Sequence, residues 1–139
     1  MTERITVERL LELDACEDQI ELVRRLLERR GWQSARLTVA NLRYAERHGC
    51  DVAWLISYGL IARDVACARA EWAYHHACSM SWSHDDTRAA ACGDPEWAYY
   101  YARHVDRGPR DDTRVAACGD PRWTRLYARD VTPLGAAND

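Results

Sequence analysis

Apolar residues recur along this chain at the three- and four-residue spacing of an α-helix, and turn-forming residues interrupt them at short intervals. In the segment that ends at Gly31, the apolar residues Ile20, Val23, Leu26 and Leu27 share one helical face. Further helical patterns follow residues suited to N-caps, namely Thr6, Thr38 and Asp51. No segment alternates with the two-residue period of a strand, so the pattern predicts an all-α protein.

The sequence of one helical pair occurs twice in the second half, between Asp86 and Thr132. The segments "ACGDPEWAYYYARHVD" and "ACGDPRWTRLYARDVT" begin 26 residues apart. The glycine of each copy is expected to end the first helix in a left-handed conformation, at Gly93 and Gly119. An aspartate followed by proline then predicts the start of the second helix, at Asp94-Pro95 and Asp120-Pro121. Another aspartate is expected to accept free N–H groups at the start of the first helix, at Asp86 and Asp112.

The residues that both copies share in the second helix lie on one stripe, because they follow the spacing i, i+4, i+5, i+8. They are Trp97/Trp123, Tyr101/Tyr127, Ala102/Ala128 and Val105/Val131. We expect this stripe to be core and the varied positions to be surface. A diverged third copy keeps the same spacing at Trp72, His76, Ala77 and Met80.

Repeated helical pairs bury their apolar faces against their neighbours. The expected fold is therefore all-α, with antiparallel helical pairs stacked as a short, HEAT-like right-handed solenoid of about 8–9 helices. A single domain is expected over residues 1–132, with an N-terminal helical module at 1–63 and three short helical-pair repeats at 64–132. Residues 133–139 are expected to be a frayed tail.

Length and composition bear on the size of the core and on the cellular compartment. With 139 residues, 47% of them hydrophobic, the chain can bury a core without disulfides or metals. Its apolar runs are far shorter than the ~20 residues that span a bilayer, and its charged beginning does not read as a signal peptide. We expect a cytoplasmic protein with no membrane partner.

The six cysteines contain no C-x-x-C pair, and are Cys16, Cys50, Cys67, Cys78, Cys92 and Cys118. Cys92 and Cys118 occupy the same repeat position, where a thiol acts as a small apolar side chain. We expect all six to be reduced and structural, with no metal.

All 19 basic residues are arginine, against 22 acidic residues and a net charge of −3. Two arginine positions recur in register, at Arg88/Arg114 and Arg103/Arg129, and would form a ladder along the stack. One interpretation is structural pairing with helix-end carboxylates. The other is recognition of a partner, because arginine is favoured at interfaces.

Catalysis has one candidate cluster, within "HHACSMSWSHDD": His75, His76, Cys78, His84, Asp85 and Asp86. The repeat explains two of these residues otherwise, since His76 takes the position of Tyr101 and Asp86 is a helix-start residue. No nucleotide-binding, zinc-protease or nucleophile motif is present. We expect a protein without enzymatic activity, catalytic residues, metals or cofactors.

The opening "ITVERLLELDACEDQIELVRRLLERRG" and the following "LTVANLRYAERHGCDVAWLI" resemble a helical module that recurs in bacteriophage and mobile-element proteins. Its marks are an Ala-Cys-x-x-Gln helix start, a Thr-capped helix and an Asp-x-x-Trp-Leu segment. The units "DDTRxAACGDPxWAYxYARxVD" resemble short helical repeats of the same group, and together the resemblance spans about residues 5 to 132. Val23 and Leu27 depart from it, because aromatic residues are usual there.

The resemblance implies a small helical protein of a phage or mobile element, a group that includes anti-CRISPR proteins. We therefore expect an inhibitor that binds a host protein or ribonucleoprotein defence complex in the bacterial cytoplasm. Alternatives are a nucleic-acid or regulatory binding module that uses the arginine ladder, and a structural phage accessory protein. The expected contact residues form an arginine-rimmed aromatic patch: Tyr99, Tyr100, His104, Arg103, Arg125, Trp82, Arg88 and Arg114.

Overall fold

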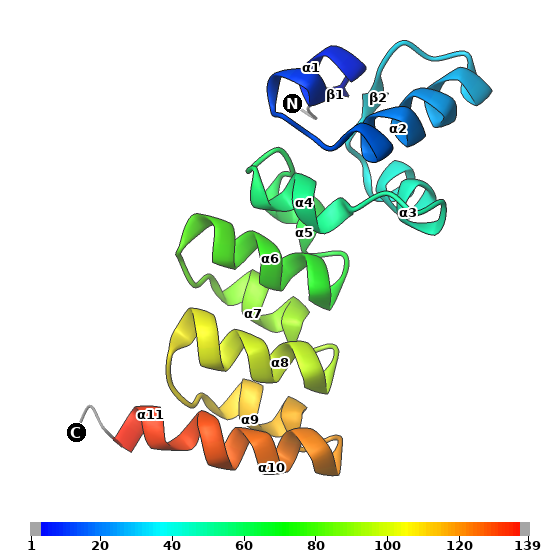
Figure 1. Ribbon diagram of the computed structural model, residues 1–139. Helices are drawn as coiled ribbons and strands as arrows, with labels where there is room; N and C mark the ends of the chain where they lie inside the picture. Colours follow the sequence, from blue (N-terminus) through cyan, green and yellow to red (C-terminus); the bar gives the residue numbers. More distant parts are fainter. Residues whose placement is uncertain (1–3, 137–139) are drawn as a thin grey trace.

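The computed structural model describes residues 4–136, and these are mostly helical, which confirms the all-α prediction (Figure 1). The first half contains α1 (Val7–Glu12), α2 (Glu17–Arg30), α3 (Val39–Arg47) and α4 (Val52–Ser57). The second half contains α5 (Arg63–Ala66), α6 (Ala70–Met80), α7 (Asp85–Ala91), α8 (Pro95–Tyr101), the π-helical turn η1 (Ala102–Asp106), α9 (Asp111–Ala117), α10 (Pro121–Asp130) and α11 (Thr132–Ala136).

One small sheet was not expected from the pattern. Strand β1 (Arg4–Ile5) pairs antiparallel with β2 (Ala35–Arg36), so that Ile5 faces Ala35 across the ladder. Two residues are too few to show a two-residue period, which is why the sequence carried no signal of a strand.

The predicted caps of the first half are confirmed. Thr6 Oγ1 accepts the Arg9 N–H at 3.0 Å, and Thr38 Oγ1 accepts the Asn41 N–H at 3.3 Å. Asp51 Oδ1 likewise accepts the Trp54 N–H at 3.1 Å. Each side chain satisfies a backbone donor that the first helical turn leaves free. Gly31 ends α2 as predicted, and its φ is 67°, a left-handed conformation.

The core of the N-terminal half does not stop at residue 63. Buried side chains from Ile5 in β1 to Trp72 in α6 form one continuous cluster, with Ile56 and Ile61 between them. The expected N-terminal module and the first helical pair therefore share one core.

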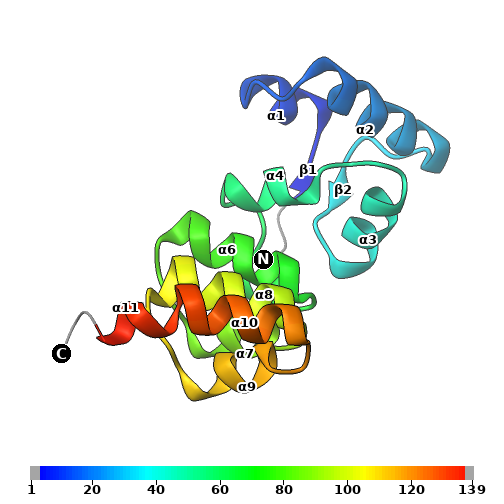
Figure 2. The same cartoon turned by 60° about the horizontal axis from the view of Figure 1, so that its bottom comes forward.

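The second half is a stack of helices in two columns (Figures 1 and 2). Helices α6, α8 and α10 pack on one another in one column, and α7 packs on α9 in the other. Helix α4 packs on α6 and so begins the first column. The three expected helical pairs are α5/α6, α7/α8 and α9/α10. The handedness of a solenoid and its likeness to HEAT repeats stay predictions.

The helix starts and ends within the repeats are partly as expected. Asp94 and Asp120 cap α8 and α10, each accepting an N–H two residues on, at 2.9 and 2.8 Å. The prediction of a left-handed conformation at the two glycines was wrong, because neither Gly93 nor Gly119 has a positive φ. A Cβ at either glycine would lie 3.2 Å from a carbonyl oxygen three residues earlier, so close backbone approach favours glycine here.

Two helix ends also differ from expectation. Helix α7 begins at Asp85, so Asp86 lies inside the first turn, where its Oδ1 accepts the Thr87 N–H at 2.7 Å. Asp112 does the same for Thr113 in α9, at 2.8 Å. In the expected frayed tail, residues 132–136 form α11 instead, and residues 137–139 lie outside the described residues.

Burial along the shared stripe depends on the neighbouring repeat. Tyr101, Ala102, Tyr127 and Val131 are buried as predicted, while Trp97, Trp123 and Val105 are half-buried. Ala128 and Met80 are exposed, so the core prediction was wrong for both. Ala102 lies in the cluster it shares with α9 and α10, whereas Ala128 lies on the last helical pair, which has no further repeat to cover it.

Candidate functional site

Tyr99 was expected on the surface, and that expectation was wrong. Its side chain is 2% exposed and packs between α8 and α10. The hydroxyl donates to Asp130 Oδ2 at 2.6 Å and accepts a hydrogen bond from Arg103 Nη1 at 2.8 Å. The Arg129 and Tyr99 hydrogen bonds hold the pKa of Asp130 well below its usual range. Tyr99 is a structural link between repeats and offers no side-chain surface to a partner.

The neighbouring rings form a line that remains partly accessible. We call Tyr74, Trp97, Tyr100 and Trp123 the aromatic row; all four are half-buried and come from α6, α8 and α10. Ring centroids are 5.4 Å apart for Tyr74 and Trp97, and 5.5 Å for Trp97 and Tyr100. Tyr100 and Trp123 are 5.7 Å apart, which carries the row to α10. These spacings are typical of interacting aromatic pairs.

The row follows from the repeat itself. Tyr74 contacts Trp97 of the next copy at 5.4 Å, and Tyr99 contacts Trp123 of the next copy at the same distance. In the last copy this position is Arg125, which is exposed, because no further tryptophan follows it. Packing against the next tryptophan therefore explains why this position is tyrosine in the first two copies and arginine in the last.

Two histidines flank the aromatic row. His75 lies 5.6 Å from Trp97, and His104 stacks on Tyr100 at 6.0 Å with 15° between the ring planes. Burial lowers the pKa of both imidazoles, and the Arg103 charge lowers that of His104 further. Both rings are therefore predominantly neutral at pH 7 and extend an uncharged surface. His104 itself is exposed, as expected.

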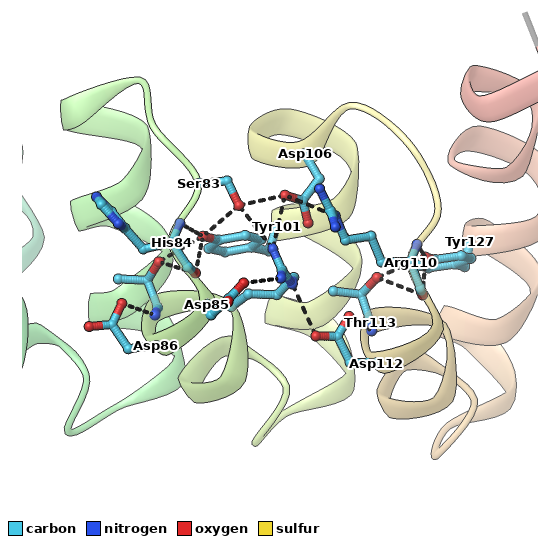
Figure 3. A network of polar contacts seen from close by, with 12 residues as sticks. Ser83, His84, Asp85, Asp86, Tyr101, Asp106, Arg110, Asp112, Thr113 and Tyr127 are labelled. Atoms are coloured by element: carbon cyan, nitrogen blue, oxygen red, sulfur yellow. Dashed lines mark hydrogen bonds and ion pairs between the residues drawn. The ribbon is translucent and has the colours of Figure 1, made fainter. Parts of the chain in front are cut away.

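Arg88 lies in a polar network between repeats rather than on a binding surface, and Figure 3 shows its partners Ser83, Asp106 and Asp112. It is 8% exposed, and its guanidinium contacts Asp85 at 2.5 Å, Asp112 at 3.0 Å and Asp106 at 3.6 Å. Burial alone lowers the pKa of Arg88, but the hydrogen bonds and charges of these aspartates outweigh it and raise the pKa. The expected exposure of Arg88 was therefore wrong.

The π-helical turn η1 places Asp106 in this network. Its side chain is 2% exposed, and Oδ1 accepts the Ser83 hydroxyl at 2.6 Å. The Arg110 Nε lies 3.7 Å from the same oxygen. Asp106 Oδ2 is buried without a hydrogen-bond partner, so the carboxylate depends on the arginines for its stability.

The other arginines of the ladder are also paired within the protein. Arg114 is exposed and contacts Asp111 at 2.8 Å. Arg103 and Arg129 converge on Asp130, at 3.7 and 2.8 Å. These ion pairs support the structural interpretation of the ladder. Arg125 is exposed on α10, and no ion pair of its side chain occurs within residues 4–136.

Trp82 is exposed, at 64%, as expected of a contact residue. It lies in the turn between α6 and α7, and its ring stacks on His84 at 4.8 Å. In the part of the chain that the structure describes, it makes no ring contact with the aromatic row. Trp82 is therefore not part of the aromatic row.

Part of the histidine-rich cluster considered for catalysis lies around Arg63, namely His76, His84 and Asp86. His84 contacts Arg63 at 3.0 Å, and Asp86 pairs with Arg63 at 2.9 Å. His76 is 7% exposed and lies in the packed stripe, as the repeat predicted. Among the described residues, no three His, Cys, Asp or Glu side chains form an arrangement suited to a metal ion. None of the six cysteines, all within that range, forms a disulfide.

Sequence reasoning missed Tyr74 and assigned Trp97 and Trp123 wholly to the core. The available signal was the alignment of Tyr74 with Tyr99, one repeat apart and each preceding a tryptophan in the next copy. Only the stacking of three helices showed that the rings touch and stay partly exposed.

No protein-family model, curated protein or solved structure matches the chain. The resemblance to phage and mobile-element repeat proteins therefore stays a prediction. No helix within residues 4–136 has the length and apolar character that crossing a bilayer demands.

Proposed function

We propose that this chain is a non-enzymatic protein-binding module whose contact surface is the aromatic row with its flanking histidines. The observation that supports the proposal is the row itself. It consists of four half-buried rings from α6, α8 and α10, which are neighbours in the stack. Trp and Tyr are enriched at interface hot spots, because they present large rigid contact area at little cost in side-chain entropy.

Charge makes this row suitable for a protein surface. Arg122 lies over the Trp123 ring at 4.9 Å, while the neutral rings of His75 and His104 border the rest. An aromatic centre with a polar and cationic rim is the composition common at protein interfaces. The partner we propose has an apolar or mixed surface with acidic groups at its edge.

In biological terms, we propose an inhibitor encoded by a phage or mobile element that blocks a bacterial defence complex by direct binding. CRISPR-Cas assemblies are the leading target class, and the site of action is then the host cytoplasm. This part of the proposal rests on the resemblance of the first sixty residues and of the repeats, and on the small size and acidic charge of the chain.

A pull-down from the lysate of a CRISPR-bearing host, read by mass spectrometry, tests the partner. The variant Tyr100→Ala/His104→Ala should fold and lose the partner, because it removes two accessible rings of the surface. Trp82→Ala/Arg125→Ala is the matched control and should retain the partner. If only the control variant loses the partner, the contact surface lies at Trp82 or Arg125 and the proposed site is wrong.

Nucleic-acid binding remains the alternative, and one contact favours it: arginine over an aromatic ring, as in Arg122 and Trp123, is a common platform for unpaired bases. Against it, Arg88, Arg103, Arg114 and Arg129 are all engaged with carboxylates. Binding to single-stranded DNA that falls steeply with salt would support this alternative. Salt-tolerant capture of one host protein would support the inhibitor.

A further inference from the structure

A long apolar cavity lies in the N-terminal half, away from the aromatic row. It has a volume of about 320 Å³ and lies between the inner face of α2 and the side chains of α1, β2, α3 and α4. This volume falls at the lower end of the roughly 300–1,000 Å³ typical of small-molecule sites. The cavity belongs to none of the contacts described for the stacked repeats.

The cavity follows α2 along its whole length. Residues that line it begin at Cys16, continue through Gln19, Val23 and Leu27, and end at Arg30. At 1.5 Å per residue these positions extend over about 20 Å. A volume of about 320 Å³ spread over that length describes a narrow channel, which suits an extended single chain better than a compact ring system.

The exposed residues that line the cavity near the two ends of α2 differ in charge. Arg30 and Trp32 line it at the C-terminal end of α2, with Trp32 at 41% exposure, and the exposed Arg36 of β2 also lines the cavity. Asp14 and Asp51 line the other end and are also exposed. Asp51 is engaged as the cap of α4, by accepting the Trp54 N–H.

The arginine end carries cationic groups without anionic partners. The Arg30 guanidinium lies 4.0 Å from the Tyr44 ring centroid and 4.8 Å from that of Trp32. Neither Arg30 nor Arg36 forms a side-chain ion pair with any of residues 4–136. The Arg30 guanidinium at the cavity is therefore available to pair with an external anion.

The two amide side chains of the wall make hydrogen bonds within the protein. The Gln19 amide donates to the Gly49 carbonyl at 3.3 Å and accepts the Asp51 N–H at 2.9 Å. The Asn41 amide donates to the Arg36 carbonyl at 2.9 Å. A channel with few free polar groups holds water poorly, and its lining side chains lose van der Waals contacts while it is empty.

We propose that this channel binds a single-chain apolar carboxylate of the fatty-acid class. The alkyl chain lies along α2 against Val23 and Leu27, and the carboxylate pairs with Arg30 at the C-terminal end of this helix. Charge complementarity sets the orientation, because the opposite end carries Asp14 and Asp51. The site is independent of the proposed aromatic contact surface.

Decanoate, used below its micelle concentration, is the probe. Titration into the folded protein labelled at Ile, Leu and Val methyl groups should give saturable NMR shifts that map to the channel, including Ile5, Val23 and Leu26. The melting temperature should rise with decanoate, because the ligand binds the folded state alone. Absence of saturable shifts, or shifts confined to α6–α10, would overturn the proposal.

Two variants and one second ligand sharpen the test. Arg30→Gln should weaken decanoate by about tenfold, through loss of a charge-assisted contact, and leave decanol unaffected. Val23→Phe should fill the channel and abolish binding of both ligands, whereas Val115→Phe on the exposed face of α9 should not. Equal affinity of the wild type for decanol and decanoate would overturn the carboxylate assignment. If Val23→Phe fails to fold, Arg30→Gln and the wild-type shift map decide.

Discussion

The hydroxyl of Tyr101 lies 2.7 Å from Oγ1 of Thr87, and one repeat later Tyr127 lies 2.8 Å from Thr113 in the same way. Each tyrosine also accepts a backbone N–H at the start of the preceding helix, at 3.2 Å from His84 and 3.1 Å from Arg110. Helices α7 and α9 have no side-chain N-cap hydrogen bond of their own. The tyrosine of the following helix therefore secures their first turns, which explains why Thr and Tyr recur unchanged.

Tyr101→Phe should lower the free energy of unfolding by about 1–3 kcal/mol, because it removes the hydrogen bond to Thr87 and leaves the part-buried His84 N–H without its acceptor. Urea denaturation measures the change. The control is Tyr58→Phe, whose ring is 50% exposed and should change stability by less than about 0.5 kcal/mol. Adding Thr87→Val to Tyr101→Phe should cost less than the two single changes combined. Full additivity would show that the hydroxyls do not interact.

Arg88 and Arg114 occupy the same repeat position with different surroundings. Arg88→Met should destabilise by about 3 kcal/mol, because it removes one of the two arginines that lie beside the buried Asp106 carboxylate. Arg114→Met should stay within about 0.5 kcal/mol, because its pair with Asp111 is exposed. Equal losses in urea denaturation would contradict the structural role of the Arg88 network.

Tyr99→Ala should destabilise the protein by about 3–5 kcal/mol, because it removes a buried ring between α8 and α10 and leaves a cavity. Arg125→Ala, at the same repeat position but exposed, is the matched control and should leave the thermal melt nearly unchanged. A Tyr99 variant that melts like the wild type would return this residue to the surface and restore it as a partner contact.

His76 predicts a dependence of stability on pH. Burial lowers its pKa most, the Arg63 and His84 charges lower it further, and Asp86 opposes them. Unfolded histidine titrates near pH ~6.5. Below that pH the unfolded chain binds more protons than the folded chain, so the free energy of unfolding decreases as the pH is lowered. His76→Phe should flatten this dependence between about pH 7 and the folded-state pKa. Thermal melts across that range test it, with His48→Phe, an exposed site on α3, as the control.

The starts and ends of several helices could be predicted from the sequence. The caps at Thr6, Thr38 and Asp51, the end of α2 at Gly31 and the Asp-Pro starts of α8 and α10 were all predicted correctly. These features depend on hydrogen bonds within one turn of the chain, so neighbouring residues suffice to specify them. The all-α fold followed from the same short-range periodicity.

What the tertiary structure decided is which part of each helix is covered. A helix inside a stack contacts neighbours on more than one side, so its buried arc is wider than the stripe of shared residues. Tyr99 is buried by α10, which the pattern on its own helix could not reveal.

The same dependence on neighbours separates positions with identical sequence. Ala102 is covered and Ala128 is not; Arg88 is covered and Arg114 is not. Repeat position is a property of the chain, but burial depends on whether another copy follows. The channel along α2 is a further case, because the apolar face from Ile20 to Leu27 has the same pattern whether its partner helices fill the space or leave it open.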